Sequence, residues 1–244
     1  MISYITSLYA VRKDYLPTLY KEFQRLVEVC SPLYVWTDEL PPFPTPPHVH
    51  FLIAPLSSFA SYIKCQTSLA LPQHRNVEKD TQDFLALMNT KVEMVWRALP
   101  YVQTPHVAWI DAGILKIVKD MPRAIKAFQS HPTFPWPHKV LVPGCWKSAK
   151  VDLYQVVSWR FCGGFFVSPT SLLPVFYEKV SRLLDAWIAA GHLAWEVNVW
   201  ADLETKEPDL FAWWSADHNE TMLEPEIESG DKVASFNLWS PHKT

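Results

Sequence analysis

The start of the chain alternates between short apolar runs and a helical segment, and this order constrains the fold more than any other feature. The pattern predicts strands over residues 2–8, 32–36 and 49–54, because each run is short, apolar and bounded by turn-forming residues. Residues 15–29, between the first two runs, place apolar side chains at helical spacing. A strand–helix–strand order favours an α/β sheet with parallel pairing.

The remainder of the chain continues the alternation. Further helices are predicted over residues 81–99, 121–130, 171–190 and 193–204, and further strands over 106–110 and 156–167, while residues 210–214 form a short aromatic run. We expect Asp80 or Thr81 to cap the first of these helices. Ser171 should cap the third, and Gly191 should end it. The proline-rich stretches 41–47 and 131–143, and the acidic tail from Glu224, are expected to be irregular. No repeat or linker interrupts the pattern, which predicts one domain over residues 1–244.

Composition narrows the functional class. The chain has 244 residues, enough for one large core, and its formal net charge of -3 argues against the basic surface that nucleic-acid binding needs. Its 4 cysteines are scattered without a C-x-x-C pair, so reduced thiols are expected. Neither a signal peptide nor an apolar stretch long enough to span a bilayer is recognisable, which predicts a soluble, cytoplasmic protein without a transmembrane segment. The 12 Trp exceed the usual need of a core, and we expect some of them to line a pocket.

A single carboxylate closes the most apolar strand of the pattern. Residues 106–110 are typical of a strand buried on both faces, and Asp111 stands where it ends, two residues before Gly113. Ligands of open α/β sheets bind outside the carboxyl ends of the strands. A carboxylate there is suited to a hard divalent ion that faces a phosphate, and the glycine admits a close ligand or backbone. The simpler role for Asp111 is to cap the next helix.

Two further motifs offer groups to such a site. Gly163 and Gly164 interrupt a predicted strand, which indicates a bulge or a close approach of substrate or of a large aromatic side chain. Glu196 opens a short helix, where the helix dipole stabilises a carboxylate. This group is suited to act as a base or to bind a sugar hydroxyl, and equally to complete an exposed helix cap.

Cationic and imidazole side chains complete the candidates. Arg75, Asn89 and Lys91 precede the strand that ends at Asp111, and Arg75 or Lys91 is suited to neutralise a diphosphate. Exposed charges on a helix face are the more common pattern. His218, within Asp217-His-Asn219, is suited to complete a metal site begun by a distant carboxylate.

Taken in order, these motifs resemble the nucleotide-sugar glycosyltransferases of the GT-A fold, and most closely the HtrL/YibB-like glycosyltransferase family. The resemblance extends from about residue 2 to 223 and rests on Trp109-Ile-Asp-Ala-Gly113, Cys162-Gly-Gly-Phe-Phe166, Trp195-Glu-Val-Asn198 and Asp217-His-Asn219. It implies an α/β, Rossmann-like GT-A domain with a mixed, mostly parallel sheet flanked by helices.

The resemblance also implies an activity. Such an enzyme moves a sugar from a nucleotide-diphosphate sugar, here a UDP-hexose, to a hydroxyl of a glycan or other acceptor. GT-A enzymes bind Mn²⁺ or Mg²⁺ with a D-x-D-type motif at this strand end. Here Asp111 is followed by Ala112 and Gly113, so the second acid is missing and His218 is the other metal ligand that the resemblance implies. Glu196 matches the acid that serves as base or sugar contact. The implied donor-binding residues are Thr6, Ser7, Tyr9, Arg75, Asn89, Lys91, Gly113, Gly163, Gly164 and Asn198.

Two other functions fit parts of the pattern. A carbohydrate-binding protein that kept the fold and lost catalysis fits the missing second acid and the excess of aromatic residues. A nucleotidyltransferase would need a glycine-rich loop after the first strand, and residues 7–13 contain no glycine. The sequence therefore favours glycosyl transfer, with Asp111 and Glu196 as the catalytic residues.

Overall fold

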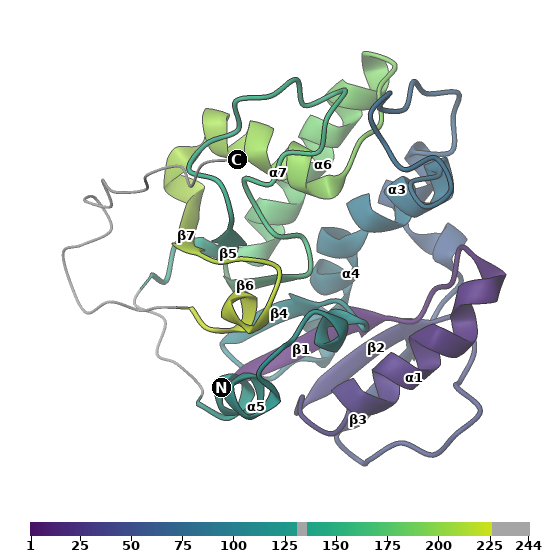
Figure 1. Cartoon of the computed structure of the whole chain (residues 1–244), viewed down its shortest axis with the longest axis vertical. Coiled ribbons are helices and arrows are strands. Elements are labelled where there is room, and N and C mark those ends of the chain that lie inside the picture. The colour runs from purple at the N-terminus through teal and green to yellow at the C-terminus, as the bar shows by residue number, and fades with distance from the viewer. Residues whose placement is uncertain (131–135, 226–244) are drawn as a thin grey trace.

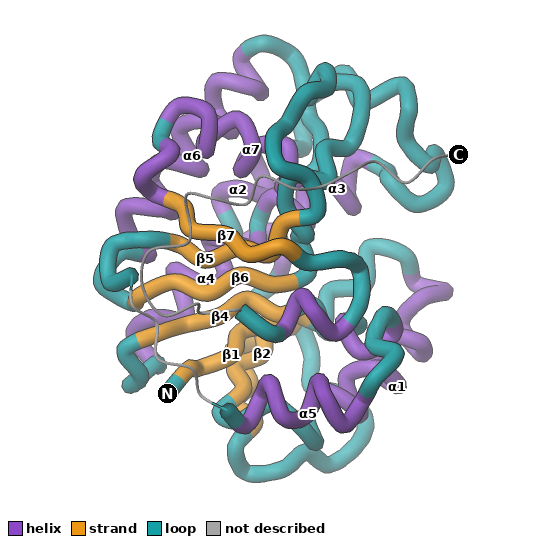
Figure 2. The backbone as a smooth tube through the Cα atoms, turned by 60° about the vertical axis from the view of Figure 1, so that its left-hand side comes forward, coloured by secondary structure: helices purple, strands orange, loops and turns teal. Residues whose placement is uncertain are grey.

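A mixed seven-stranded sheet forms the centre of the protein, as seen in a computed structural model that describes residues 1–130 and 136–225 (Figure 1). Its strands are β1 (Ile2–Ser7), β2 (Leu33–Thr37), β3 (Val49–Ile53), β4 (His106–Ile110), β5 (Val140–Gly144), β6 (Phe165–Pro169) and β7 (Phe211–Ser215). The order across the sheet is β3-β2-β1-β4-β6-β5-β7, and Figure 2 shows β7, β5, β6, β4 and β1 stacked in this order. The predicted α/β class is confirmed.

The sheet is mostly parallel, as predicted. β1 pairs in parallel with β2 and β4, β2 with β3, and β5 with β7. β6 is antiparallel to both of its neighbours, β4 and β5. Among the described strands β6 alone runs against the others, so all the others end at one edge. From β1 the chain builds outward to β2 on one side and later to β4 on the other, so the topological switch point lies between β1 and β4.

Helices cover both faces of the sheet and enclose two cores. The helices are α1 (Leu16–Leu26), α2 (Ala60–Lys64), α3 (Gln82–Asn89), α4 (Lys91–Ala98), α5 (Met121–Gln129), α6 (Leu173–Ala189) and α7 (Glu196–Lys206). Short 3-10 turns occupy Lys13–Tyr15, Leu56–Ser58, Leu99–Tyr101, Ile114–Lys116, Pro208–Leu210 and, as η6, Glu220–Leu223. On one face α1 and α5 bury Phe23 and Phe128 against the sheet. The other face is covered by α4, α6 and α7 (Figure 1). Phe166, Phe176 and Trp200 are buried in the core on this side.

Two of the predicted helix ends are confirmed and one is wrong. The Thr81 hydroxyl accepts a hydrogen bond from the Phe84 backbone N–H and so caps α3. Gly191 follows α6 with a φ of 83°, the left-handed conformation that glycine adopts at no steric cost. Ser171 is not the cap of α6, which begins at Leu173 after Leu172 without a side-chain cap.

The predicted helix over residues 81–99 is two helices, α3 and α4, that meet at Thr90. No proline or glycine stands at the break. Instead Asn89 and Thr90 turn their side chains back onto the preceding turn, with bonds of 2.9 Å to Leu85 O and 2.8 Å to Ala86 O. Such side-chain bonds to backbone carbonyls bend helices. The break makes Lys91 the first residue of α4.

The predictions for residues 131–143 and 156–167 are also wrong where the structure describes them. Val140–Gly144 forms β5, because the apolar run Val140–Val142 outweighs the neighbouring prolines and Pro143 lies near the strand end, where a missing N–H is tolerated. Only the end of 156–167 is strand, so Gly163 and Gly164 precede β6 rather than interrupt it. Residues 131–135 and the tail from residue 226 lie outside the described residues. Within residues 1–130 and 136–225, no helix is both long and apolar enough to cross a bilayer.

Candidate active site

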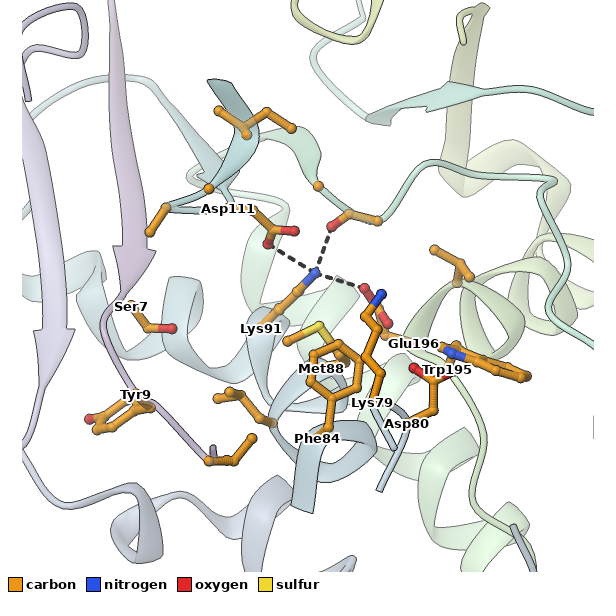
Figure 3. A pocket seen from close by; sticks show the side chains of 18 of the residues that line it. Ser7, Tyr9, Lys79, Asp80, Phe84, Met88, Lys91, Asp111, Trp195 and Glu196 are labelled. Carbon is orange, nitrogen blue, oxygen red and sulfur yellow. Dashed lines mark hydrogen bonds and ion pairs between the residues drawn. The ribbon is translucent and has the colours of Figure 1, made fainter. Parts of the chain in front are cut away.

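A cavity of about 600 Å³ opens where β1 and β4 end. Its lining includes Ser7 at the end of β1, Asp111 directly after β4, and Glu196 at the start of α7 (Figure 3). The cavity therefore lies at the switch point of the sheet, where open α/β sheets bind their ligands. Its volume is in the range of small-molecule sites.

Lys91 forms the centre of the cavity floor, held between two carboxylates (Figure 3). Its Nζ lies 2.7 Å from Glu196 Oε1, 3.0 Å from Asp111 Oδ1 and 2.9 Å from the Gly163 carbonyl oxygen. These three contacts match the three hydrogens of an ammonium group. The residue is only 1% exposed and Glu196 is buried as well, so the cluster is an ion triad with a buried centre that joins α4, the end of β4 and the start of α7.

The charge of Lys91 is secured by its partners. Burial lowers the pKa of the ammonium, but Asp111 and Glu196 outweigh that penalty and raise the pKa above its ordinary value. Lys91 was predicted to neutralise a diphosphate. In the structure its three donors are already engaged, so it fixes the two carboxylates and meets a ligand only at the cavity floor.

Asp111 is positioned from both sides. Its backbone N–H donates to the Gly164 carbonyl oxygen at 2.9 Å, and its Oδ1 accepts from the Trp109 indole at 2.7 Å. Lys91 contacts the same Oδ1. Oδ2 is therefore the oxygen left for a ligand, on a side chain that is 37% exposed.

Gly163 and Gly164 make room for this cluster, as their predicted close approach requires. A Cβ on Gly163 would overlap the Glu196 carboxylate, and one on Gly164 would lie 2.7 Å from Ile114 Cδ1. The close neighbours are thus the ion triad and Ile114 rather than a bulge over a large aromatic ring.

The structure gathers most of the predicted site residues around the cavity. Those that line it are Ser7, Tyr9, Lys91, Asp111, Gly113, Gly163, Gly164, Glu196 and His218. Contrary to expectation, four predicted donor-binding residues do not line it: Thr6, Arg75, Asn89 and Asn198.

The amides among these four hold the scaffold together. Asn89 Nδ2 donates to Leu85 O and, at 2.8 Å, to Ala194 O, which ties α3 to the segment before α7. Asn198 is fully buried and bonds the backbone of Ser158, Leu153 and Val156. Both amides bond backbone groups instead of lining the cavity, because buried polar side chains need hydrogen-bond partners within the protein.

Thr6 and Arg75 do not line the cavity, for different reasons. Thr6 is fully buried within β1, one residue before Ser7, and successive strand residues face opposite sides of the sheet. The Arg75 guanidinium donates to the Pro72 carbonyl oxygen at 2.9 Å and so closes its own turn.

His218 contacts thiols as well as the cavity. Its Nδ1 lies 3.8 Å from Cys145 Sγ, which in turn lies 3.0 Å from Cys162 Sγ. The Cys162 thiol and His218 lower the pKa of Cys145 to about 6, and the same contact with Cys145 raises the pKa of His218. His218 therefore belongs to a sulfur–imidazole cluster beside the cavity.

Asp111 Oδ2 is the cavity oxygen that the predicted Mn²⁺ or Mg²⁺ ion would contact. Asp111 Oδ2 is a hard ligand on the cavity wall, but the Lys91 ammonium holds the other oxygen at 3.0 Å. Within the described residues, the group of three possible metal ligands that lie within 4.8 Å of one another is Cys145, Cys162 and His218, and Asp111 is outside it. Binding of one Mn²⁺ or Mg²⁺ ion by both Asp111 and His218 stays a prediction.

Several residues that line the cavity were not predicted as site residues from the sequence. They are Arg12, Lys79, Asp80, Phe84, Trp159 and Trp195. Asp80 was expected as a helix cap and as part of the polar cluster before the Asp111 strand, not as a ligand-binding residue, yet its Oδ1 is buried without a hydrogen-bond partner from the described residues. The Trp excess did signal a lined pocket, since Trp109, Trp159 and Trp195 all face it. Arg12 and Lys79 lie in loops without periodicity, and only the fold brings them to the cavity.

The chain matches no protein-family model, and a search of curated proteins likewise finds no match. The site must therefore be interpreted from its own chemistry.

Proposed function

We propose that this protein is a glycosyltransferase that moves a hexose from a nucleoside diphosphate, in the first place UDP, to a hydroxyl acceptor. The observation that carries the proposal is the Asp111–Lys91–Glu196 triad on the floor of a cavity at the switch point of the sheet. Two fixed carboxylates facing one cavity are suited to bind sugar hydroxyls and to accept a proton.

The cavity wall supplies groups for a nucleoside diphosphate. Arg12 and Lys79 are the lining cations that lie outside the ion triad, and both are suited to bind phosphate oxygens. Asp80 Oδ1, a buried acceptor without a partner in the described chain, is suited to a ribose hydroxyl or a base N–H. Phe84 and Trp195 offer flat faces for a base or a sugar (Figure 3).

In the proposed reaction the bond between the anomeric carbon and the diphosphate oxygen breaks, and the bond to the acceptor oxygen forms. Arg12 and Lys79 neutralise the charge that develops on the leaving diphosphate. Glu196 keeps Oε2 for the acceptor, because Oε1 is held by Lys91. In an inverting reaction Glu196 Oε2 takes the hydroxyl proton, whereas a retaining reaction needs no base in this place.

A divalent ion is proposed to bind Asp111 Oδ2 together with the donor, and it would supply charge neutralisation at the diphosphate. One carboxylate oxygen beside an ammonium is a weak ion site by itself. Mn²⁺ is therefore expected to bind the protein tightly only with a nucleoside diphosphate, and calorimetric titration of Mn²⁺ with and without UDP measures this dependence.

The function is tested with a panel of nucleotide sugars, by calorimetric binding and by hydrolysis of the donor. The full chain is expected to bind UDP and to hydrolyse at least one UDP-hexose slowly in the absence of acceptor. Asp111→Ala should abolish turnover while the fold survives, because Lys91 retains Glu196. Asp209→Ala, on an exposed residue far from the described contacts of the site, is the matched control. Wild-type turnover by Asp111→Ala would refute the assignment.

A carbohydrate-binding protein without catalysis is the second candidate. It is favoured by one observation, the near-complete burial of Glu196 at 5% exposure together with its bond to Lys91. Glycan binding without affinity for any nucleotide sugar would support this function and exclude the first.

A further inference from the structure

Three segments far apart in the sequence place two thiols and an imidazole together beside the cavity. Cys145 directly follows β5, Cys162 precedes β6, and His218 follows β7. Because β6 runs against β5 and β7, the ends of two strands and the start of a third meet at one edge. The ligand atoms of the three residues all lie within 4.8 Å of one another.

Backbone hydrogen bonds hold these segments in place. The Cys162 N–H donates to Pro143 O at 2.8 Å, and the Ala216 N–H donates to Gly144 O at 3.0 Å. The buried Arg160 adds a bond of 2.8 Å from Nη1 to Trp146 O. The cluster is thus carried on paired strand ends, which position side chains more precisely than free loops do.

The donor atoms have the spacing of a tetrahedral soft-metal site with a small adjustment. Zinc bound to two thiolates and one imidazole separates sulfur from sulfur by about 3.8 Å and sulfur from nitrogen by about 3.6 Å. Here Cys145 Sγ lies 3.8 Å from His218 Nδ1 and 3.0 Å from Cys162 Sγ. A rotation of the half-buried Cys145 side chain that moves its sulfur by under about 1 Å opens the sulfur–sulfur distance to that of a zinc site. The Cys162 sulfur and the His218 nitrogen, which lie within 4.8 Å of each other, come closer by a further side-chain adjustment.

We propose that Cys145, Cys162 and His218 bind a Zn²⁺ ion. Two thiolates and an imidazole are soft or borderline ligands, which select Zn²⁺ over the hard Mn²⁺ and Mg²⁺. The ion enters without a redox change, and the two thiols release their protons to solvent. Its fourth position faces a cavity of about 250 Å³ lined by Cys145, Trp146, Trp159, Asp217 and His218. A water molecule or the exposed Asp217 carboxylate can occupy that position.

The zinc site would fasten one wall of the larger cavity. Trp159 and His218 line both cavities, and their rings meet edge to face with centroids 4.6 Å apart. An ion that joins His218 to the end of β5 and the segment before β6 would fix the loop after β7 beside the proposed donor site. This role gives His218 a different metal from the one that the family resemblance implied.

The test uses the full chain, kept reduced with a phosphine, freed of metal and titrated with Zn²⁺ against a chromophoric chelator. One equivalent of Zn²⁺ is expected to bind, and Co²⁺ in its place should give a thiolate-to-cobalt charge-transfer band. Cys145→Ser, Cys162→Ser and His218→Ala should each weaken binding at least tenfold. Cys30→Ala and Cys65→Ala, which remove buried thiols outside the cluster, are the matched controls and should bind as the wild type does.

A readout without substitutions guards against variants that fail to fold. Zn²⁺ should protect Cys145 of the wild-type chain from alkylation, as measured by peptide mass spectrometry. The proposal is overturned if the reduced chain binds no Zn²⁺, if the cobalt band keeps its full intensity in both Cys145→Ser and Cys162→Ser, or if the control variants lose the ion equally. It is also overturned if Cys145 and Cys162 form a disulfide in air and their reduced form takes up no metal, which would make them a redox pair.

Discussion

At the scale of single residues, Lys91 decides the character of the site. An ammonium that is 1% exposed and shared by two carboxylates sets both their position and their charge balance. The sequence marked Lys91 as a phosphate ligand, because a lysine on a helix looks free until its neighbours are known. Its partners lie 20 and 105 residues away along the chain, counted from the numbers of Asp111 and Glu196, and only the fold joins them.

Removal of Lys91 should destabilise the protein and abolish the proposed transfer activity. Lys91→Met leaves the buried Glu196 carboxylate without its counter-charge, and an unpaired buried charge of this kind costs about 3–5 kcal/mol. Urea unfolding measures the loss. Lys64→Met, which breaks a pair with the half-exposed Asp185, should change the free energy of unfolding by at most about 1 kcal/mol.

A second substitution checks the cause of that effect. Adding Glu196→Gln to Lys91→Met neutralises the stranded carboxylate and should recover part of the lost stability. A double variant no more stable than Lys91→Met would show that the loss comes from packing rather than from charge.

Gly163 and Gly113 form a natural pair for testing close approach. A Cβ at Gly163 would overlap the Glu196 carboxylate and lie 2.9 Å from Val197 Cγ1, whereas at Gly113 the nearest atoms belong to Lys116 at 3.7 Å. Gly163→Ala should therefore lower the free energy of unfolding by about 1–3 kcal/mol. Gly113→Ala should leave it within about 0.5 kcal/mol. Equal effects in thermal unfolding would contradict the role given to Gly163.

At the scale of elements, the turn η6 is fastened to the start of α5 by one carboxylate. Glu220 Oε2 accepts from the backbone N–H groups of Lys119 at 2.9 Å and Asp120 at 3.3 Å. These bonds, that from Lys119 foremost, lower the pKa of Glu220 below its usual value. The contact thus links the segment after β7 to the helix that covers the opposite face from α6.

This contact predicts a pH dependence of stability. A carboxyl whose pKa is lower in the folded state stabilises the fold above its unfolded pKa, and the contribution disappears as the pH falls through the folded pKa. Glu220→Gln should therefore melt below the wild type at pH 7, and the gap should close in the acid range below about pH 4. Glu28→Gln, on an exposed residue, is the control. A gap that stays constant from pH 7 to pH 3 would argue against the assignment.

Element boundaries were predictable where a residue type with a strong preference for a helix end marks them. The Thr81 cap and the Gly191 end follow from groups within a few residues, and both are seen. The strand Val140–Gly144 depends on its long-range pairing with β7, and the break at Thr90 comes from side-chain bonds to the preceding turn without a proline or glycine to mark it. Neither was predicted from the sequence. The apolar core of β5 was hidden among prolines, whose usual effect on strands is the opposite one.

At the scale of the whole molecule, the order of strands and helices sufficed to predict an α/β sheet of mostly parallel strands. It also sufficed to place the cavity at the end of β4, because ligand sites of open sheets follow from topology. The sequence could not reveal which polar residues stay on the surface of the cavity. Asn89 and Asn198 use their side-chain amides to bond backbone groups that lie far away along the chain. The fold must be known before these partners can be identified.

Ligand binding should stabilise the entire fold. A nucleoside diphosphate that binds only the folded chain adds about 2.7 kcal/mol at 100 times its Kd, which for this size raises Tm by roughly 5–10 °C. Scanning fluorimetry measures the shift, with uridine as the ligand that lacks phosphates. Arg12→Ala combined with Lys79→Ala should shrink the UDP shift towards the uridine value. Equal shifts with UDP and uridine would deny a phosphate site.

The concentration of strand ends at one edge has a consequence for how such a molecule can change. Ser7, Asp111 and His218 lie at or after the ends of β1, β4 and β7, and Gly163 and Gly164 lie before β6, whereas Lys91 and Glu196 stand on α4 and α7. Some loop residues at this edge, such as Ile114 and Phe161, belong to the cores, so only the exposed loop positions can vary without repacking a core. A change in the exposed turn residues can therefore alter ligand preference while Lys91 and Glu196 stay in place, and the opposite edge of the sheet is the place to attach a tag or a second module without disturbing the cavity.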